Sequence, residues 1–305
     1  MLEHGTTLLA PYPDPVLDLP RSVRLALWLR AAIEGRATVR DVLRAVRGDD
    51  EPHTIDATDW AEWVQRADDD RTDSAADPLG SGAEDLGRAL EWLLPRAAGV
   101  QVVLPVPGDI VGLRGPGAMS TAAMDVGECV FVDLSPDARG TLPVPQSVTS
   151  SVDAVGLVPE VTEFGSWLEP GAMVTWRAWP VAAPPAPVGD MGSLAEADRI
   201  LREALREATE ALADMDVSRW REDASDRITA IRDGGLDRRA APASTPPRAL
   251  RVLASASRVR AIVDLAMQDD GAAIVGWQAN VRRTTLRDVG EVARRAMVAA
   301  TNAPR

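Results

Sequence analysis

The stretch Gly99-Val-Gln-Val-Val-Leu104 marks the change from a helical to an extended pattern, and it decides the fold. Before it, Leu86, Leu90 and Leu93 recur at helical spacing until Pro95 ends the run. After it, short apolar runs alternate with glycine and proline, which is typical of strands and turns. We therefore predict an α+β fold in which N-terminal helices precede a central antiparallel β-sheet or small barrel.

The strands of this sheet are predicted from several short apolar segments. Residues 100–104 and 110–113 flank Pro105-Val-Pro-Gly108, whose Pro-Gly pair suits the centre of a type II turn, so they predict a hairpin. In the strand predicted at 172–181, Trp176 and Trp179 point to opposite faces, so we expect other parts of the chain to cover both faces of this strand. The remaining strands are predicted at 126–134, 152–158 and 172–181.

Residues 1–98 are predicted to be mainly helical. Ser22 is expected to cap the first helix, and the first two helices also fit a weak helix-turn-helix pattern. The acidic segment 67–83 is expected to be a loop, because it lacks the glycine and glutamate that a calcium loop needs. The helices are expected over 23–33 and 39–46, around Trp60 and Trp63, and over 83–94.

Two proline-containing segments, 182–192 and 240–247, are predicted linkers in the second half of the chain. Thr285 and Asp288 resemble a capping box, so three helices are expected at the C-terminus. The predicted parts are an N-terminal helical region (1–98), a β domain (99–181), a helical arm or hairpin (193–239) and a C-terminal helical unit (248–305).

The helical arm begins with a seam of apolar residues. A 4-3 spacing joins Leu194, Leu201, Leu205, Ala208, Leu212 and Met215, with Asp198 at one seam position. The phase changes near 214–218, where we expect a bend. Two interpretations stay open, a monomer that packs the seam internally and a homodimer formed through 194–215. Fewer than three clean heptads favour internal packing.

The chain contains no lysine, so all 33 basic side chains are arginine. It therefore has no lysine for a Schiff base with pyridoxal phosphate or for a P-loop. The segment Gly108–Gly117 also lacks the GxGxxG pattern, and we predict no cofactor. Codon bias in a G+C-rich genome explains the missing lysines; selection against lysine modification is the alternative.

Metal-binding and nucleophilic side chains are scarce. Two histidines, His4 and His53, and the single Cys129 are too few for a zinc site, so we predict no metal site of this kind. His53 follows acidic residues and is expected in a solvated loop. Cys129 lies in an apolar strand and is expected to be buried and inert.

Charge is distributed unevenly along the chain, whose net charge is −13. Residues 236–305 contain twelve arginines against six acidic residues. We expect these arginines to dock within the chain or to be solvated, and nucleic acid is an unlikely partner because acidic residues interrupt them. They include Arg248, Arg251, Arg258, Arg260, Arg282, Arg283, Arg287, Arg294 and Arg295.

The sequence shows neither the pattern of a secretory signal at its start nor that of a transmembrane helix. The first ten residues have no basic segment before an apolar run, and no window holds 18 consecutive apolar residues. We therefore expect a cytoplasmic protein with no membrane partner.

Three functions remain open, and no catalytic residue can be assigned. The favoured one is a non-catalytic interaction or regulatory protein that presents loops or a sheet face of the β domain to an unknown protein partner. The second is a carboxylate-dependent, possibly metal-assisted, hydrolase or transferase. The third is a DNA-associated regulator that uses the arginine-rich C-terminus. The carboxylate candidates are Asp109, Asp125, Glu128 and Asp133.

Overall fold

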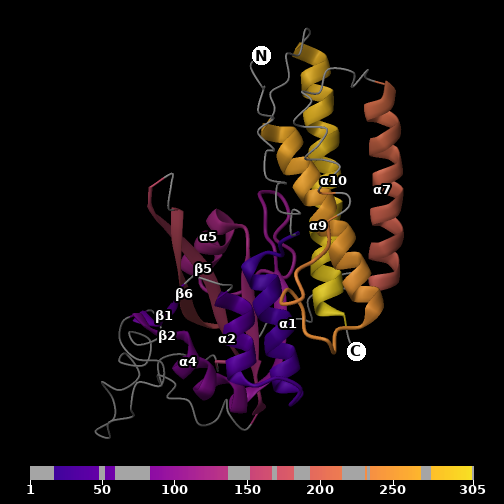
Figure 1. The fold of residues 1–305 in the computed structure, drawn as a ribbon. Helices are drawn as coiled ribbons and strands as arrows, with labels where there is room; N and C mark the ends of the chain where they lie inside the picture. The colour runs from indigo at the N-terminus through magenta and orange to yellow at the C-terminus, as the bar shows by residue number, and fades with distance from the viewer. Residues whose placement is uncertain are drawn as a thin grey trace, which may run out of the picture.

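The computed structural model describes residues 17–47, 52–58, 83–136, 152–166, 170–181, 193–214, 231, 234–268 and 276–303. Within these ranges, a sheet with helices on it lies beside a group of long helices (Figure 1). The predicted α+β class is confirmed. The helices are α1 (Arg21–Ile33), α2 (Val39–Arg47), α4 (Leu86–Leu93), η1 (Leu94–Arg96, a 3-10 helix), α5 (Gly117–Val126), α7 (Leu194–Asp214), α9 (Pro247–Gln268) and α10 (Gly276–Asn302).

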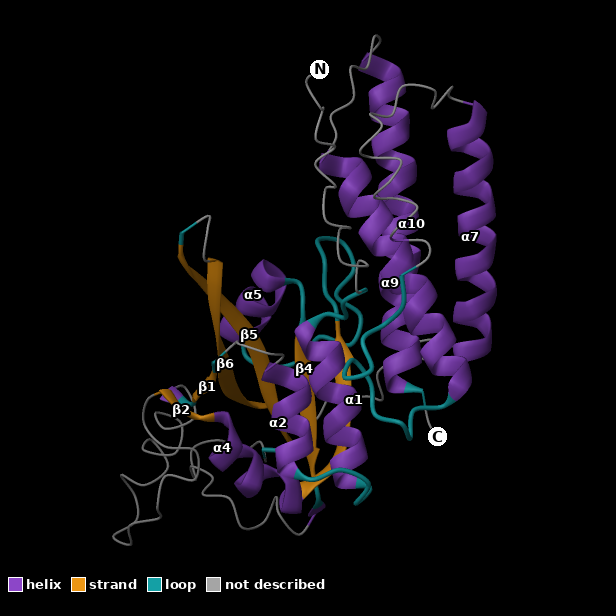
Figure 2. Cartoon of the chain, in the orientation of Figure 1, coloured by secondary structure: helices purple, strands orange, loops and turns teal. Residues whose placement is uncertain are grey.

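The strands form one open sheet in the order β2-β1-β6-β5-β4-β3 (Figure 2). Strands β3 to β6 pair antiparallel, as predicted, and each lies beside the next in the chain. Strand β1 joins β6 in parallel, so the sheet is mixed. The bounds are β1 (His53–Asp56), β2 (Ala83–Asp85), β3 (Ala97–Val103), β4 (Cys129–Leu134), β5 (Ala154–Gly165) and β6 (Pro170–Val181).

The predicted hairpin of 100–104 with 110–113 is wrong. Strand β3 pairs with β4 instead, and residues 104–116 form a loop. Gly108, Gly112 and Gly115 take positive φ angles of 90°, 85° and 117°, which breaks the extended backbone that a return strand needs. The strand predicted at 126–134 begins too early, because helix α5 extends to Val126 and β4 starts only at Cys129.

Two hydrophobic clusters lie on opposite faces of the sheet. Helices α1, α2 and α4 contribute to the cluster that contains Trp176, whereas α5 contributes Met119 to the cluster of Phe131 and Trp179. Both indoles are buried, which confirms the expected cover on both sides of β6. Gly156 leaves room for Met119, since a Cβ at Gly156 would lie 2.3 Å from the Met119 Cε.

The C-terminal unit does not contain three helices of its own. Helix α10 runs unbroken through Thr285 and Asp288, so the predicted capping box is wrong, and the third helix packed with α9 and α10 is α7. Gly290 interrupts helix propensity but faces α9, where a Cβ would come within 3.5 Å of Val263. The bend expected after Asp214 and the helix around Trp60 and Trp63 lie outside the described residues.

Candidate interaction site at the junction of sheet and helices

The outer edge of β3 is covered by side chains from α1 and α10. Arg30 donates to the Val100 carbonyl at 3.0 Å. Asn302 pairs with Val102 twice: its Oδ1 accepts from the backbone N–H at 2.9 Å and its Nδ2 donates to the carbonyl at 2.8 Å. These contacts take the place of a neighbouring strand along this edge. They also fix α10 against the sheet.

The loop after β3 begins with a tight turn. Val106 and Asp109 exchange backbone hydrogen bonds of 3.1 and 2.9 Å, and Gly108 between them has a φ of 90°. A further bond of 3.0 Å joins the Leu113 N–H to the Ile110 carbonyl. The loop is therefore closed by its own backbone, and Asp109 is directed toward α10.

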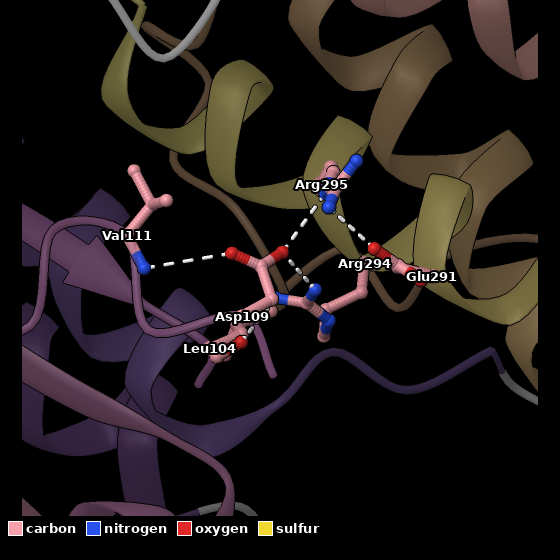
Figure 3. A network of polar contacts seen from close by, with 6 residues as sticks. All are labelled: Leu104, Asp109, Val111, Glu291, Arg294 and Arg295. Carbon is pink, nitrogen blue, oxygen red and sulfur yellow. Dashed lines mark hydrogen bonds and ion pairs between the residues drawn. The ribbon is translucent and has the colours of Figure 1, made fainter. Parts of the chain in front are cut away.

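Asp109 forms a clamp with Arg294 and Arg295 of α10 (Figure 3). Its Oδ2 accepts from Arg294 at 2.5 Å and from the Arg295 Nε at 2.9 Å, and Arg294 also donates to the Leu104 carbonyl. Burial opposes ionisation of Asp109, which is 11% exposed, but the two guanidinium groups outweigh it and hold its pKa at about 2. Arg295 pairs in addition with Glu291.

Two apolar side chains follow the clamp directly. Ile110 is 58% exposed and Val111 is 60% exposed, and we call this pair the 110–111 tip. The Val111 backbone nitrogen lies 3.5 Å from the Asp109 Oδ1, so Asp109 contacts both the tip and the arginines of the clamp (Figure 3). Large apolar side chains held outward on an ordered loop are typical of a protein contact.

The four candidate carboxylates do not form one site. Asp109 is in the clamp, Asp133 pairs with Arg114, and Asp125 is exposed on α5. Glu128 accepts from the Ser22 N–H at 2.8 Å. Among the residues that the structure describes, no three His, Cys, Asp or Glu side chains are grouped to hold a metal ion.

Glu128 has a role that the sequence did not indicate. Helix α1 starts at Arg21 after Pro20, so Ser22 lies inside the helix and the predicted Ser22 cap is wrong. The carboxylate of Glu128, the residue that precedes β4, accepts a hydrogen bond from the N–H of Ser22 instead. Burial raises the pKa of Glu128, although the Ser22 hydrogen bond and the charges of Arg260 and Arg21 oppose the change.

His53 and Cys129 both lie in strands. His53 was predicted in a solvated loop, but it is buried at the start of β1, where its Nδ1 accepts from the Trp176 Nε1 at 3.0 Å. The parallel pairing of β1 with β6 brings these two residues together. The expected burial of Cys129 is confirmed, and burial with the nearby Glu128 charge raises its thiol pKa to about 12.

Several C-terminal arginines have partners inside the chain. Arg294 and Arg295 belong to the clamp. The structure does not describe the side chain of Arg282, and Arg251, Arg283 and Arg287 are exposed. The other partners are the Gly234 carbonyl for Arg258 (3.0 Å), Asp198 for Arg248 (3.6 Å) and Asp264 for Arg260 (3.8 Å).

The chain belongs to a family described in two parts. The Rv1486c-like protein, N-terminal domain, matches residues 22–191, and the Rv1486c-like protein, C-terminal domain, matches residues 195–298. "Uncharacterized protein Rv1486c" of Mycobacterium tuberculosis is 30% identical over 271 residues, which cover 79% of this chain and 81% of that protein. "Uncharacterized protein ML1804" of Mycobacterium leprae is 28% identical over 220 residues, 67% of each chain.

No solved structure matches the chain. Within the described ranges, no helix combines the length and the apolar character that crossing a bilayer requires.

Proposed function

We propose that this chain is a non-catalytic, cytoplasmic interaction protein that binds a protein partner through the 110–111 tip. The observation that carries the proposal is the coupling of two exposed β-branched side chains to a partly buried ion-pair clamp. An anchor that is ordered before binding loses little conformational freedom on binding. The tip thus combines apolar area with a fixed position, which is what an interaction site needs.

The charges around the tip define the kind of partner. Asp109 and Glu291 balance Arg294 and Arg295, so the clamp has no net charge. A partner would gain contact energy mainly by burying Ile110 and Val111 in an apolar pocket. We therefore expect binding at this site to depend only weakly on salt.

The two other functions receive less support from the described residues. The candidate carboxylates of the enzyme hypothesis are separated, and three of them already bind Arg114, Ser22 or the clamp arginines. Several arginines of the DNA hypothesis bind acidic side chains or carbonyl groups of the same chain. A regulatory role through a protein partner agrees with these contacts.

A site-specific crosslink tests the proposal. A photo-crosslinking residue at position 111 of the full-length chain would identify contacting proteins in an extract of the source cells. The purified partner would then be titrated with the wild type and with the Ile110→Ser/Val111→Ser double variant. We expect the double variant to bind about tenfold more weakly or worse, because each exposed branched side chain loses apolar contact.

Ile200→Ser is the matched control, since Ile200 is also an exposed branched residue but lies on α7. It should bind like the wild type. Equal affinity of the tip double variant and the wild type, with both folded, would refute the proposed site.

A further inference from the structure

Strands β5 and β6 continue beyond the rest of the sheet. They pair with each other over their full lengths, from Ala154↔Val181 to Gly165↔Pro170. In contrast, β4 pairs with β5 only over 154–157, and β1 pairs with β6 only over 174–177. Residues 158–165 of β5 therefore have an edge that no described strand pairs. We call the segments 158–165 and 170–173 the ribbon, and it extends past α5 in Figure 2.

The ribbon carries exposed apolar side chains on both faces. Val161 is 40% exposed and Phe164, on the opposite face, is 56% exposed. The Phe164 ring lies over Gly171, where a Cβ would come within 2.5 Å of the ring. Two strands alone are marginally stable in water, and an unpaired edge presents free C=O and N–H groups; on this edge Pro159 supplies no N–H. A third strand would pair these groups and cover Val161 or Phe164.

The acidic side chains of the ribbon determine which kind of strand can pair with its free edge. Residues 152–166 contain no arginine but three acidic residues, Asp153, Glu160 and Glu163. Arg177 pairs with Glu160 at 3.1 Å, whereas Glu163 is exposed and has no ion pair with a described residue. A second copy of β5 paired antiparallel about Thr162 would place Glu163 diagonally opposite its own counterpart on the same face, and pairing about Glu163 would place the two carboxylates directly opposite; both arrangements are unfavourable. A strand with basic residues on the face of Glu163 would instead place opposite charge beside this carboxylate.

We propose that the free edge of β5, residues 158–165, is a strand-addition site for an extended basic segment of a partner protein. Backbone pairing supplies the affinity, and alternating apolar and basic side chains supply the specificity. Basic residues on one face of the added strand lie beside Glu163, and apolar residues on its other face cover Phe164. The site is separate from the 110–111 tip.

A synthetic peptide of alternating arginine and valine, eight residues long, serves as the probe. Fluorescence anisotropy with the full-length chain should show binding that weakens with salt, and hydrogen exchange should slow within 158–165. A peptide with glutamate in place of arginine should bind at least about threefold more weakly. Methylation of alternate backbone nitrogens of the probe should abolish binding if strand pairing is the mode.

Variants of the chain locate the contact. Glu163→Arg should weaken arginine-peptide binding by about threefold or more, and Val161→Ser/Phe164→Ser should weaken it further. The Ile110→Ser/Val111→Ser variant should bind the peptide like the wild type, which separates this proposal from the function of the tip. Undetectable peptide binding, or binding that ignores Glu163→Arg and backbone methylation, would overturn the strand-addition site.

Discussion

At the scale of single residues, two carboxylates show how location determines what an acidic side chain does. Asp109 and Glu128 were both candidates for catalysis, and each instead binds a helix of the same chain. Asp109 binds two arginines of α10, whereas Glu128 binds the backbone at the start of α1. Their pKa values move in opposite directions, down for Asp109 and up for Glu128. The two residues should therefore give opposite pH dependences of stability.

Replacement of Asp109 by asparagine should destabilise the protein by about 1–3 kcal/mol near pH 7, because the change leaves two arginines without their carboxylate. The folded-state pKa of Asp109, about 2, lies below its ordinary value of 3.8. Its stabilising effect is thus complete above about pH 4 and is lost as the pH falls toward 2. Urea unfolding of wild type and variant across this range should show the difference shrinking. Asp264→Asn, which removes an exposed pair with Arg260, is the control and should change little.

Variants of Glu128 test the opposite pH dependence of stability, because the pKa of this residue is raised. Because its pKa is raised above 4.5, folding favours the protonated form, and this contribution to stability is lost as the pH rises through the folded-state pKa. Glu128→Gln keeps an oxygen acceptor for the Ser22 N–H and removes the buried charge. We expect its unfolding free energy to change less with pH above 4.5 than that of the wild type. Glu128→Ala should lose about 1 kcal/mol through the missing helix cap. A pH profile unchanged by Glu128→Gln would contradict this account.

At the scale of elements, the sequence pattern predicted what depends on local periodicity. Apolar spacing indicated α1, α2 and α4, and alternation with β-branched residues indicated the cores of β3, β4, β5 and β6. It missed β1, whose four residues are held by pairing with β6, a strand more than a hundred residues away. It did not predict α5, because six of the seven residues at 117–123 are small and give little amphipathic pattern.

The cover of the β3 edge is a second long-range feature, and it can be tested through Asn302. Asn302→Ala removes both hydrogen bonds to Val102 and leaves a backbone N–H and C=O without those partners. We expect a loss of about 1–3 kcal/mol and faster hydrogen exchange of the Val102 amide. Arg287→Ala, at an exposed position of the same helix, should leave that exchange rate unchanged. Equal exchange at Val102 in both variants would show that Asn302 does not protect the edge.

At the scale of the whole molecule, the basic C-terminal segment contacts the acidic part of the chain through the ion pair of Arg294 with Asp109. Helix α1 is joined to the C-terminus separately, because Arg30 donates to the Thr301 and Ala303 carbonyl groups. The pattern predicted two oppositely charged parts but not the partners, because pairing is set by where α10 lies against β3. The 110–111 tip was missed for the same reason: Ile110 and Val111 resemble a strand until the surrounding turns are known.

The seam of α7 permits a test of how the long helices assemble. Leu201 is buried, and Leu194 and Leu205 pack against the same core of the chain. If this internal packing holds the helix in solution, Leu201→Ala should cost about 2–5 kcal/mol because it leaves a cavity. The midpoint of unfolding should then be independent of protein concentration for both wild type and variant, since no subunits separate. Ile200→Ala, at the exposed neighbouring position, should cost far less. A wild-type midpoint that rises with concentration, and loses that rise in Leu201→Ala, would instead assign the seam to a homodimer.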